Sequence, residues 1–270
     1  MAEYLAKSED LTAVADAIRT KGGTDAQLTF PDGFIGAVQS ISAGTAITDG
    51  IVVKSRNADG SPAEIDYYGS TLYQYQFGFN GYGTRCNPFS LITKVNFKNA
   101  ITSTATGVFE NAVNLQSILI PEDVVIRFQN SYVKNCTSLS EVEVLSESAV
   151  SGYSSFSGCS ALLRFIAPKM RDVNATSTTT NAMFKGCDAL ETVQFGSVGF
   201  GVTRLTNAVF NNAQNNLVIT IYTNGSYADT ALANARNGAT NATIIIKASE
   251  ATTYNGTSYA AGDTIITSTV

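Results

Sequence analysis

The sequence predicts a β-rich α/β solenoid with a parallel strand ladder, a small N-terminal helical hairpin and β caps at both ends. Three observations predict this fold. A motif of aromatic, small and leucine residues recurs every 23 to 28 residues, each copy ends in an alternating apolar stretch, and the flanking segments lack the motif. We therefore divide the chain into a helical hairpin (1–42), a β-rich cap (44–85), the solenoid (86–225) and a C-terminal cap of helix and β-hairpin (226–270).

The repeat is clearest in "SFSGCSALLRFIAP" (155–168) and "MFKGCDALETVQFG" (183–196). An aromatic residue at position zero is followed by Cys at +3, Leu at +6 and apolar residues at +9 and +11. The copies start at Cys86, Phe109, Val133, Phe156, Phe184 and Phe210, with spacings of 23, 24, 23, 28 and 26 residues. These spacings fall within the range of roughly 20–29 residues that is typical of leucine-rich repeats.

Each copy predicts one strand and one tight turn. Positions +8 to +12 alternate between apolar and polar residues, which indicates a short strand with one buried face. Positions zero, +3 and +6 advance in steps of three, as expected for a helical or 3₁₀ turn. A single unit cannot bury its own apolar side, so neighbouring units stack and their strands pair in parallel.

The +3 position holds Cys136, Cys159 and Cys187 in three copies, and Ala112 and Ala213 in two others. A position that accepts Ala or Cys is a tight one, and a free Cys behaves as a small buried hydrophobe. The alternative is a metal site, but a column of residues one repeat apart does not converge tetrahedrally. We predict structural cysteines and neither a metal nor a cofactor.

The pattern F-x-G-C-x-x-L-x-x-[IVF] resembles the BspA-like (Treponema pallidum type) leucine-rich repeats of bacterial surface proteins. The resemblance covers about residues 86–225 and weakens at Val133 and in "VFNNAQNNLVITIY". It implies a right-handed solenoid that binds proteins or surfaces, commonly in adhesion, and it implies no catalytic residues.

The N-terminal segment predicts two short amphipathic helices. Residues 8–21 place apolar residues at i, i+3, i+4 and i+7, and a second helix is expected to run from Pro31 to Ile41. "LTAVADAIRTKGGTDAQLTFPDGFIGAVQSI" is similar to N-terminal segments of tail-associated proteins of phages and prophages of Gram-positive bacteria. This similarity implies attachment to other virion proteins, or multimerisation into a homo-oligomer.

The segments that flank the repeats predict further strands. Tyr73, Tyr75, Phe77 and Phe79 alternate with smaller or polar residues, which predicts a strand. Its rings form either the core of the N-terminal cap, which we favour, or an aromatic platform for binding sugars. After the repeats, "SYADTALANARNGA" predicts a helix, "NATIIIKAS" a strand, and Asn255-Gly256 the turn of a hairpin.

Composition excludes several classes of function. The net charge of −5 and the lack of a Lys/Arg run argue against nucleic acid and anionic membrane surfaces as partners. No apolar run reaches the ~18 residues of a membrane span, and no signal peptide begins the chain. We therefore expect a virion protein, or an extracellular or cell-surface protein exported by another route. The absence of His removes Ser/His and Cys/His nucleophiles and His-containing metal sites.

The strand positions that point outward, +8 and +10, are the candidate binding residues. They are Ser117, Leu119, Glu141, Glu143, Arg164, Ile166, Thr192 and Gln194, followed by Val218 and Thr220. Glu141 and Glu143 are also the best candidates for a catalytic carboxylate pair, although exposed acids are more often simply solvated. We expect a non-enzymatic protein that binds a cell-surface protein or polysaccharide, either as a phage or prophage tail-associated protein or, alternatively, as a bacterial adhesin.

Overall fold

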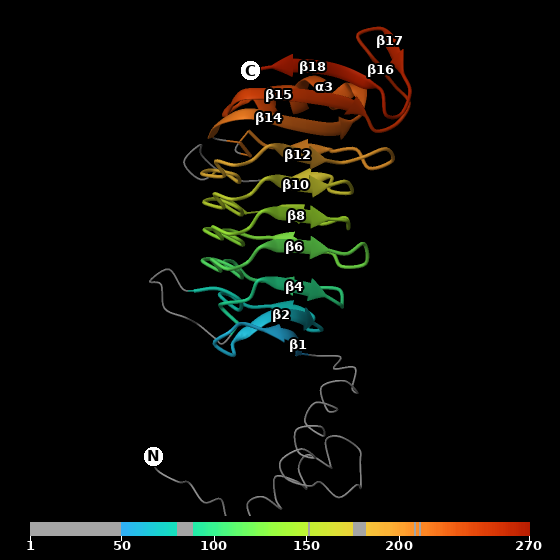
Figure 1. Ribbon diagram of the computed structural model, residues 1–270. Coiled ribbons are helices and arrows are strands. Elements are labelled where there is room, and N and C mark those ends of the chain that lie inside the picture. The colour runs from blue at the N-terminus through green and yellow to red at the C-terminus, as the bar shows by residue number, and fades with distance from the viewer. Residues whose placement is uncertain (1–49, 80–88, 151, 175–181, 208, 211) are drawn as a thin grey trace, which may run out of the picture. The chain divides into compact units, whose positions relative to one another are not determined.

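The computed structural model describes residues 50–79, 89–150, 152–174, 182–207, 209–210 and 212–270, without the side chains of 212–215. All of them belong to one unit of the chain, Asp49–Val270. The predicted helical hairpin, residues 1–42, lies outside the described residues, as does Cys86. Within the described unit, the long strands stack one above another from β1 to β18 (Figure 1).

The repeats stack into a ten-stranded sheet, with the order β1-β2-β4-β6-β8-β10-β12-β14-β15-β18. Neighbouring strands run parallel from β2 to β15, and β1 and β18 add antiparallel at the two edges (Figure 1). The predicted parallel ladder is therefore confirmed. The strands are β1 (Ile51–Arg56), β2 (Pro62–Tyr67), β4 (Lys94–Phe97), β6 (Ser117–Ile120), β8 (Glu141–Val144), β10 (Arg164–Ala167), β12 (Thr192–Phe195), β14 (Asn212–Thr223), β15 (Ala239–Ala248) and β18 (Thr264–Thr269).

A second wall of very short strands closes the other side of each turn. It consists of a parallel sheet ordered β13-β11-β9-β7 and of the pair β3-β5. These strands are β3 (Thr71–Leu72), β5 (Ser103–Thr104), β7 (Arg127–Phe128), β9 (Ala149–Val150), β11 (Asp172–Val173) and β13 (Arg204–Leu205). The sequence did not predict this wall, because two residues are too few to show a period.

The segment after the repeats forms the predicted elements. The 3₁₀ helix η2 (Gly225–Tyr227) leads into α3 (Ala228–Arg236), and a hairpin of β16 (Thr252–Tyr254) and β17 (Thr257–Tyr259) precedes β18. Asn255 and Gly256 both have positive φ angles, of 47° and 78°. This is the geometry that a two-residue hairpin requires and that an Asn-Gly pair adopts readily.

The interior repeats the same side chains from turn to turn. Position zero supplies a column of rings, in which Phe77 lies 5.0 Å from Phe109, and Phe184 lies 6.0 Å from Phe156 and 5.7 Å from Phe210. The +6 position supplies Leu115, Leu139, Leu162 and Leu190, all at most 1% exposed. Because every copy meets the same neighbours above and below, the same residue types fit at each level.

The tight turns are held by hydrogen bonds to the next repeat. The backbone N–H of Phe109 donates to the carbonyl of Tyr132, and that of Phe156 donates to the carbonyl of Met183. Two residues after position zero the backbone is left-handed, and Asn111, Asn135, Gly158 and Gly186 occupy these positions. Gly and Asn tolerate that conformation best, which explains the Gly before Cys in the clearest copies.

The repeated cysteines are buried, as predicted. Cys136, Cys159 and Cys187 are fully buried, and their Sγ atoms lie 3.0, 3.0 and 3.1 Å from the position-zero carbonyl oxygens of the preceding repeats, to which they donate. Burial raises the pKa of the Cys136 and Cys187 thiols well above the ordinary value. In the described part of the chain, no three Cys, His, Asp or Glu side chains gather as metal ligands would.

One expectation about the segment before the repeats is wrong. Residues 73–79 form turns rather than the predicted strand, and Phe77 stacks on Phe109 in the place that a position-zero ring takes in later repeats. The N–H of Phe77 donates to the carbonyl of Val108, the bond that Phe109 makes to Tyr132 one repeat later. The predicted start at Cys86 lies outside the described residues, but Phe89, at +3 from it, accepts from the N–H of Ile92 as Ala112 accepts from Leu115.

Candidate binding face

We define the outer face as the side of the ten-stranded sheet that points away from the core. The eight predicted residues all stand on it, on β6, β8, β10 and β12. Strand register aligns them in two columns, Ser117, Glu141, Arg164 and Thr192 in one, and Leu119, Glu143, Ile166 and Gln194 in the other. The predicted placement is thus observed, because side chains alternate between faces of a strand.

The outer face is accessible where the inner one is not. Val142, Phe165 and Val193, on the inner side of β8, β10 and β12, are completely buried. On the outer side Leu119 is 39% exposed, and Glu143 and Ile166 are half-buried by their neighbours on the sheet. A partner that docks on this face can therefore reach both apolar and charged side chains.

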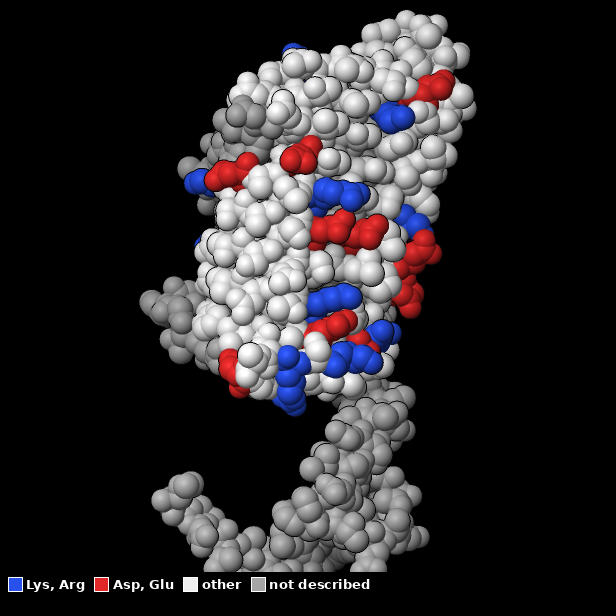
Figure 2. Space-filling view, in the orientation of Figure 1, with Lys and Arg blue, Asp and Glu red and all other residues white. Residues whose placement is uncertain are grey.

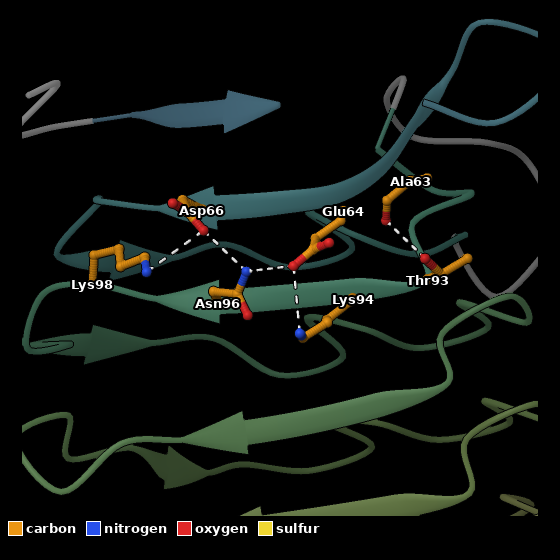
Figure 3. Close-up of polar contacts among 7 residues, drawn as sticks. All are labelled: Ala63, Glu64, Asp66, Thr93, Lys94, Asn96 and Lys98. Atoms are coloured by element: carbon orange, nitrogen blue, oxygen red, sulfur yellow. Dashed lines mark hydrogen bonds and ion pairs between the residues drawn. The ribbon is translucent and has the colours of Figure 1, made fainter. Parts of the chain in front are cut away.

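Most charges on the N-terminal half of the outer face are paired across strands. The ammonium group of Lys94 lies 3.4 Å from the Glu64 carboxylate, and that of Lys98 lies 3.7 Å from Asp66 (Figure 3). Further along the sheet, the Arg164 guanidinium lies 3.3 Å from the Glu141 carboxylate. The two solvent-exposed pairs, Lys94–Glu64 and Arg164–Glu141, contribute only about 0–1 kcal/mol each to stability, whereas Asp66 is buried. All three pairs leave little net charge for a ligand.

Asn96 links the two acidic side chains of β2. Its Nδ2 atom donates to Glu64 Oε1 and to Asp66 Oδ1, at 3.0 Å in both cases (Figure 3). The Asn96 hydrogen bond, followed by the nearby Lys94 charge, lowers the pKa of the Glu64 carboxyl below its ordinary value of 4.5. The local network therefore favours the ionised form of Glu64.

Glu143 differs from these acids. Its partners on the two neighbouring strands are Leu119 of β6 and Ile166 of β10, and both are apolar. Among the described residues its carboxylate makes no ion pair, whereas Glu141 two positions earlier is paired with Arg164. The column at the middle of the sheet thus holds one unneutralised carboxylate between two accessible apolar side chains.

The C-terminal part of the outer face carries almost no charge, as the space-filling view also shows (Figure 2). Register extends one column through Val218 of β14 and Thr243 of β15 to Thr269 of β18. It extends the other through Thr220 and Ile245 to Thr267. Among the described side chains of these columns and their flanks, Lys247 is charged, and its ammonium group lies 5.7 Å from the centre of the Tyr222 ring. The sequence pattern predicts these columns only as far as Thr220, because β15 and β18 lie outside the repeat motif.

The four aromatic residues proposed as a platform do not share one exposed surface. Phe77 is fully buried against Phe109, Tyr75 and Phe79 are half-buried, and Tyr73 is 65% exposed. Tyr73 lines an open hollow of about 430 Å³ together with Tyr67, Thr71 and Gln76. Alternation suggested a common face, but residues 73–79 form turns, so their side chains point in different directions.

Comparison with known families agrees with the repeat analysis. Residues 86–218 match the BspA type leucine rich repeat region, in six copies. Those residues are therefore similar to leucine-rich repeats of the BspA type, over just under half of the chain. No curated protein and no solved structure matched the sequence. None of the helices in the described part of the chain has the length and apolarity that crossing a bilayer requires.

Proposed function

Because residues 86–218 match the BspA type leucine rich repeat region, we propose that the protein is a non-enzymatic binding protein whose outer face contacts a molecule on a cell surface. The observation that carries this proposal is the column of Leu119, Glu143 and Ile166 at the middle of the face. Most neighbouring charges are already paired, so this column offers the groups that a ligand can still satisfy.

The chemistry of this column favours a protein partner. Apolar side chains of Leu119 and Ile166 gain free energy when a partner covers them, at about 25 cal/mol per Å² of apolar surface. Covering them also removes water from Glu143, whose carboxylate then needs a donor such as Lys, Arg or a backbone N–H. A polysaccharide hydroxyl can supply that donor too, but it covers less apolar surface.

The setting that we propose is the tail of a phage or prophage of a Gram-positive bacterium. The support is the resemblance, read from the sequence alone, of residues 11–41 to segments of tail-associated proteins, which would attach the solenoid to other virion proteins. A second candidate is a bacterial surface adhesin. The BspA-type match favours it, because repeats of this type are typical of surface and extracellular proteins.

The binding proposal is tested on intact Gram-positive cells with fluorescently labelled full-length chain. Glu143→Lys and Ile166→Glu should each weaken binding at least about tenfold, the effect of losing about 1.4 kcal/mol. Arg127→Glu is the matched control, since Arg127 is exposed on β7 of the opposite wall, and it should bind like the natural chain. Equal losses in all three variants, or none, would contradict a binding site on the outer face.

The two settings are separated by where the protein is found. Purified phage particles released by lysis should contain the chain in the first setting, detected by mass spectrometry. Detection only on the surface of the producing bacterium would support the adhesin. Removing residues 1–42 should abolish incorporation into particles while leaving binding to cells intact, and loss of cell binding instead would show that this segment holds the binding site.

A further inference from the structure

The two edges of the ten-stranded sheet are built differently. On edge strand β1, Lys54 and Arg56 are exposed, and the pairing with β2 shifts register at Val53/Ser55 and again at Ser55/Arg56. Charges and bulges of this kind keep an edge from pairing with another strand. Edge strand β18, Thr264–Thr269, contains only Thr, Ile and Ser and carries no charge. Its pairing with β15 shifts register once, at Ile246/Lys247, and stays regular from Ile266 to Thr269. This stretch therefore lacks the protection that the opposite edge has.

The backbone of β18 is ready to pair on its open side. The N–H of Val270 donates to the carbonyl of Ala242 on β15. The backbone N–H and C=O groups of an antiparallel strand alternate in direction. Those of Ile266 and Ser268 therefore also point toward β15, and those of Thr267 and Thr269 point to the open edge. In the part of the chain that the structure describes, β15 is the strand that β18 pairs with.

We propose that a second copy of this chain pairs with β18 in antiparallel fashion, about a two-fold axis at Thr267. Such an interface is self-complementary, since the same edge serves both copies. Thr267 then faces its own copy and makes both backbone hydrogen bonds of the pair, and Thr–Thr neighbours across strands are favourable. Neither strand brings a like charge to the contact.

The apolar side chains of this edge support the same partner. Ile266 packs on the core but stays partly exposed on the inner side of β18. Pairing about Thr267 brings the two Ile266 side chains within diagonal reach of each other, which extends the core across the axis. Pairing of β18 with β1 of another copy is disfavoured, because Lys54, Arg56 and the register shifts interrupt that edge.

The dimer would join two large sheets into one and place two outer faces side by side. If the outer face is the binding surface proposed above, the dimer can engage two sites on one cell surface. The second contact then becomes intramolecular, which raises avidity by about 10²–10⁴ where the geometry permits. The pairing itself does not depend on that function.

Light scattering on the full-length chain tests this pairing. We expect Thr267→Lys to halve the molar mass of the particle, because it places two like charges on the axis. Thr267→Pro should also halve it, because proline lacks the N–H that faces the open edge, and such a proline leaves the β15–β18 bonds intact. Thr267→Val keeps both the shape and the N–H, and Thr243→Lys places the same charge on β15, so both should keep the natural mass.

Circular dichroism on each variant shows whether it is folded. If Thr267→Pro does not fold, the molar mass of Thr267→Lys alone tests the pairing. A natural chain that scatters as a 28.5 kDa monomer at every concentration would overturn the proposal. A larger particle whose mass Thr267→Lys leaves unchanged would overturn it as well, and would point to another surface. The proposal is also overturned if the chain alone stays monomeric and the β18 edge instead binds a strand of a different protein.

Discussion

The inside and the outside of the same strands follow opposite rules. On the inner side of β6, β8, β10 and β12, nearly every position is a fully buried apolar residue, and the rings, thiols and leucines of the turns recur in register. On the outer side the two columns change from one strand to the next, from Ser117 to Glu141 to Arg164 in one column. The inner side is uniform and the outer side is diverse.

This difference teaches where the information of a solenoid lies. Inside, each repeat meets the same space, so one residue type satisfies every level and a departure has a large energetic cost. Outside, water surrounds each side chain, so substitutions have little effect on stability and the surface is free to match a ligand. Substitutions on the inner side should therefore lower the free energy of unfolding strongly, and substitutions on the outer side should change it little.

The largest expected effect comes from the column of rings. Phe156→Ala should lower the free energy of unfolding by about 3–5 kcal/mol, because it opens a cavity between buried rings on both sides. Urea unfolding of both proteins measures this. Tyr73→Ala is the matched control, since its ring is 65% exposed, and it should change stability by about 0.5 kcal/mol or less. A similar loss in the control would contradict the division between inside and outside.

A smaller effect is expected in the cysteine column. Cys159→Ala should lower the free energy of unfolding by about 1 kcal/mol, because it removes a weak hydrogen bond to Val133 and the packing of one sulfur atom. Buried Ala112 shows that alanine fits the same position in an earlier repeat. Complete loss of folding in Cys159→Ala would mean that the thiol does more than pack. The natural protein should also resist alkylation of its buried thiols until urea unfolds it.

One interior substitution should act in the opposite direction. Among the described residues, the fully buried hydroxyl of Tyr132 has no hydrogen-bond partner, and burial raises the pKa of this hydroxyl well above the ordinary value. Tyr132→Phe should therefore raise the free energy of unfolding by about 1 kcal/mol, because it removes a desolvated polar group without changing shape. Tyr67→Phe is the control. It should lower the free energy of unfolding, because the Tyr67 hydroxyl donates to the carbonyl of Thr71.

The smallest effect concerns the outer face and depends on pH. Glu64 has a lowered pKa in the folded protein, so its interactions stabilise the fold above the pKa of the unfolded chain and are lost as the pH falls through the folded value. Asn96→Ala removes the main cause of the shift and should raise the pKa of Glu64 toward 4.5, measured by NMR titration. The variant should be less stable at neutral pH, and the deficit should shrink in acid.

Much of the architecture could be predicted from the chain, and the failures have a common cause. Motif spacing located the strands of the repeats because a register of side chains is visible in sequence. It did not reveal that Phe77 takes the place of a position-zero ring, because only its hydrogen bond to Val108 and its stacking on Phe109 show that equivalence. The alternation of residues 73–79 suggested a strand, because a short period does not distinguish a strand from a turn that bonds to the next repeat.

The candidate site shows the same limit. The outward positions could be named in advance because alternation along a strand decides which side chains leave the core. The sequence could not show which of these side chains remain available to a ligand. Glu141 and Glu143 are equivalent in sequence, and only the neighbouring strand places Arg164 beside the first while Leu119 and Ile166 flank the second.

The sequence by itself determined the repeat, the parallel ladder, the buried cysteines and the side of each strand that meets water, because all of these follow from local periodicity. Tertiary structure alone decided the second wall, the place of Phe77, the pairing of charges on the outer face and the contrast between edges β1 and β18. Those features depend on residues far apart in the chain, whose distances and hydrogen bonds arise only when the turns stack.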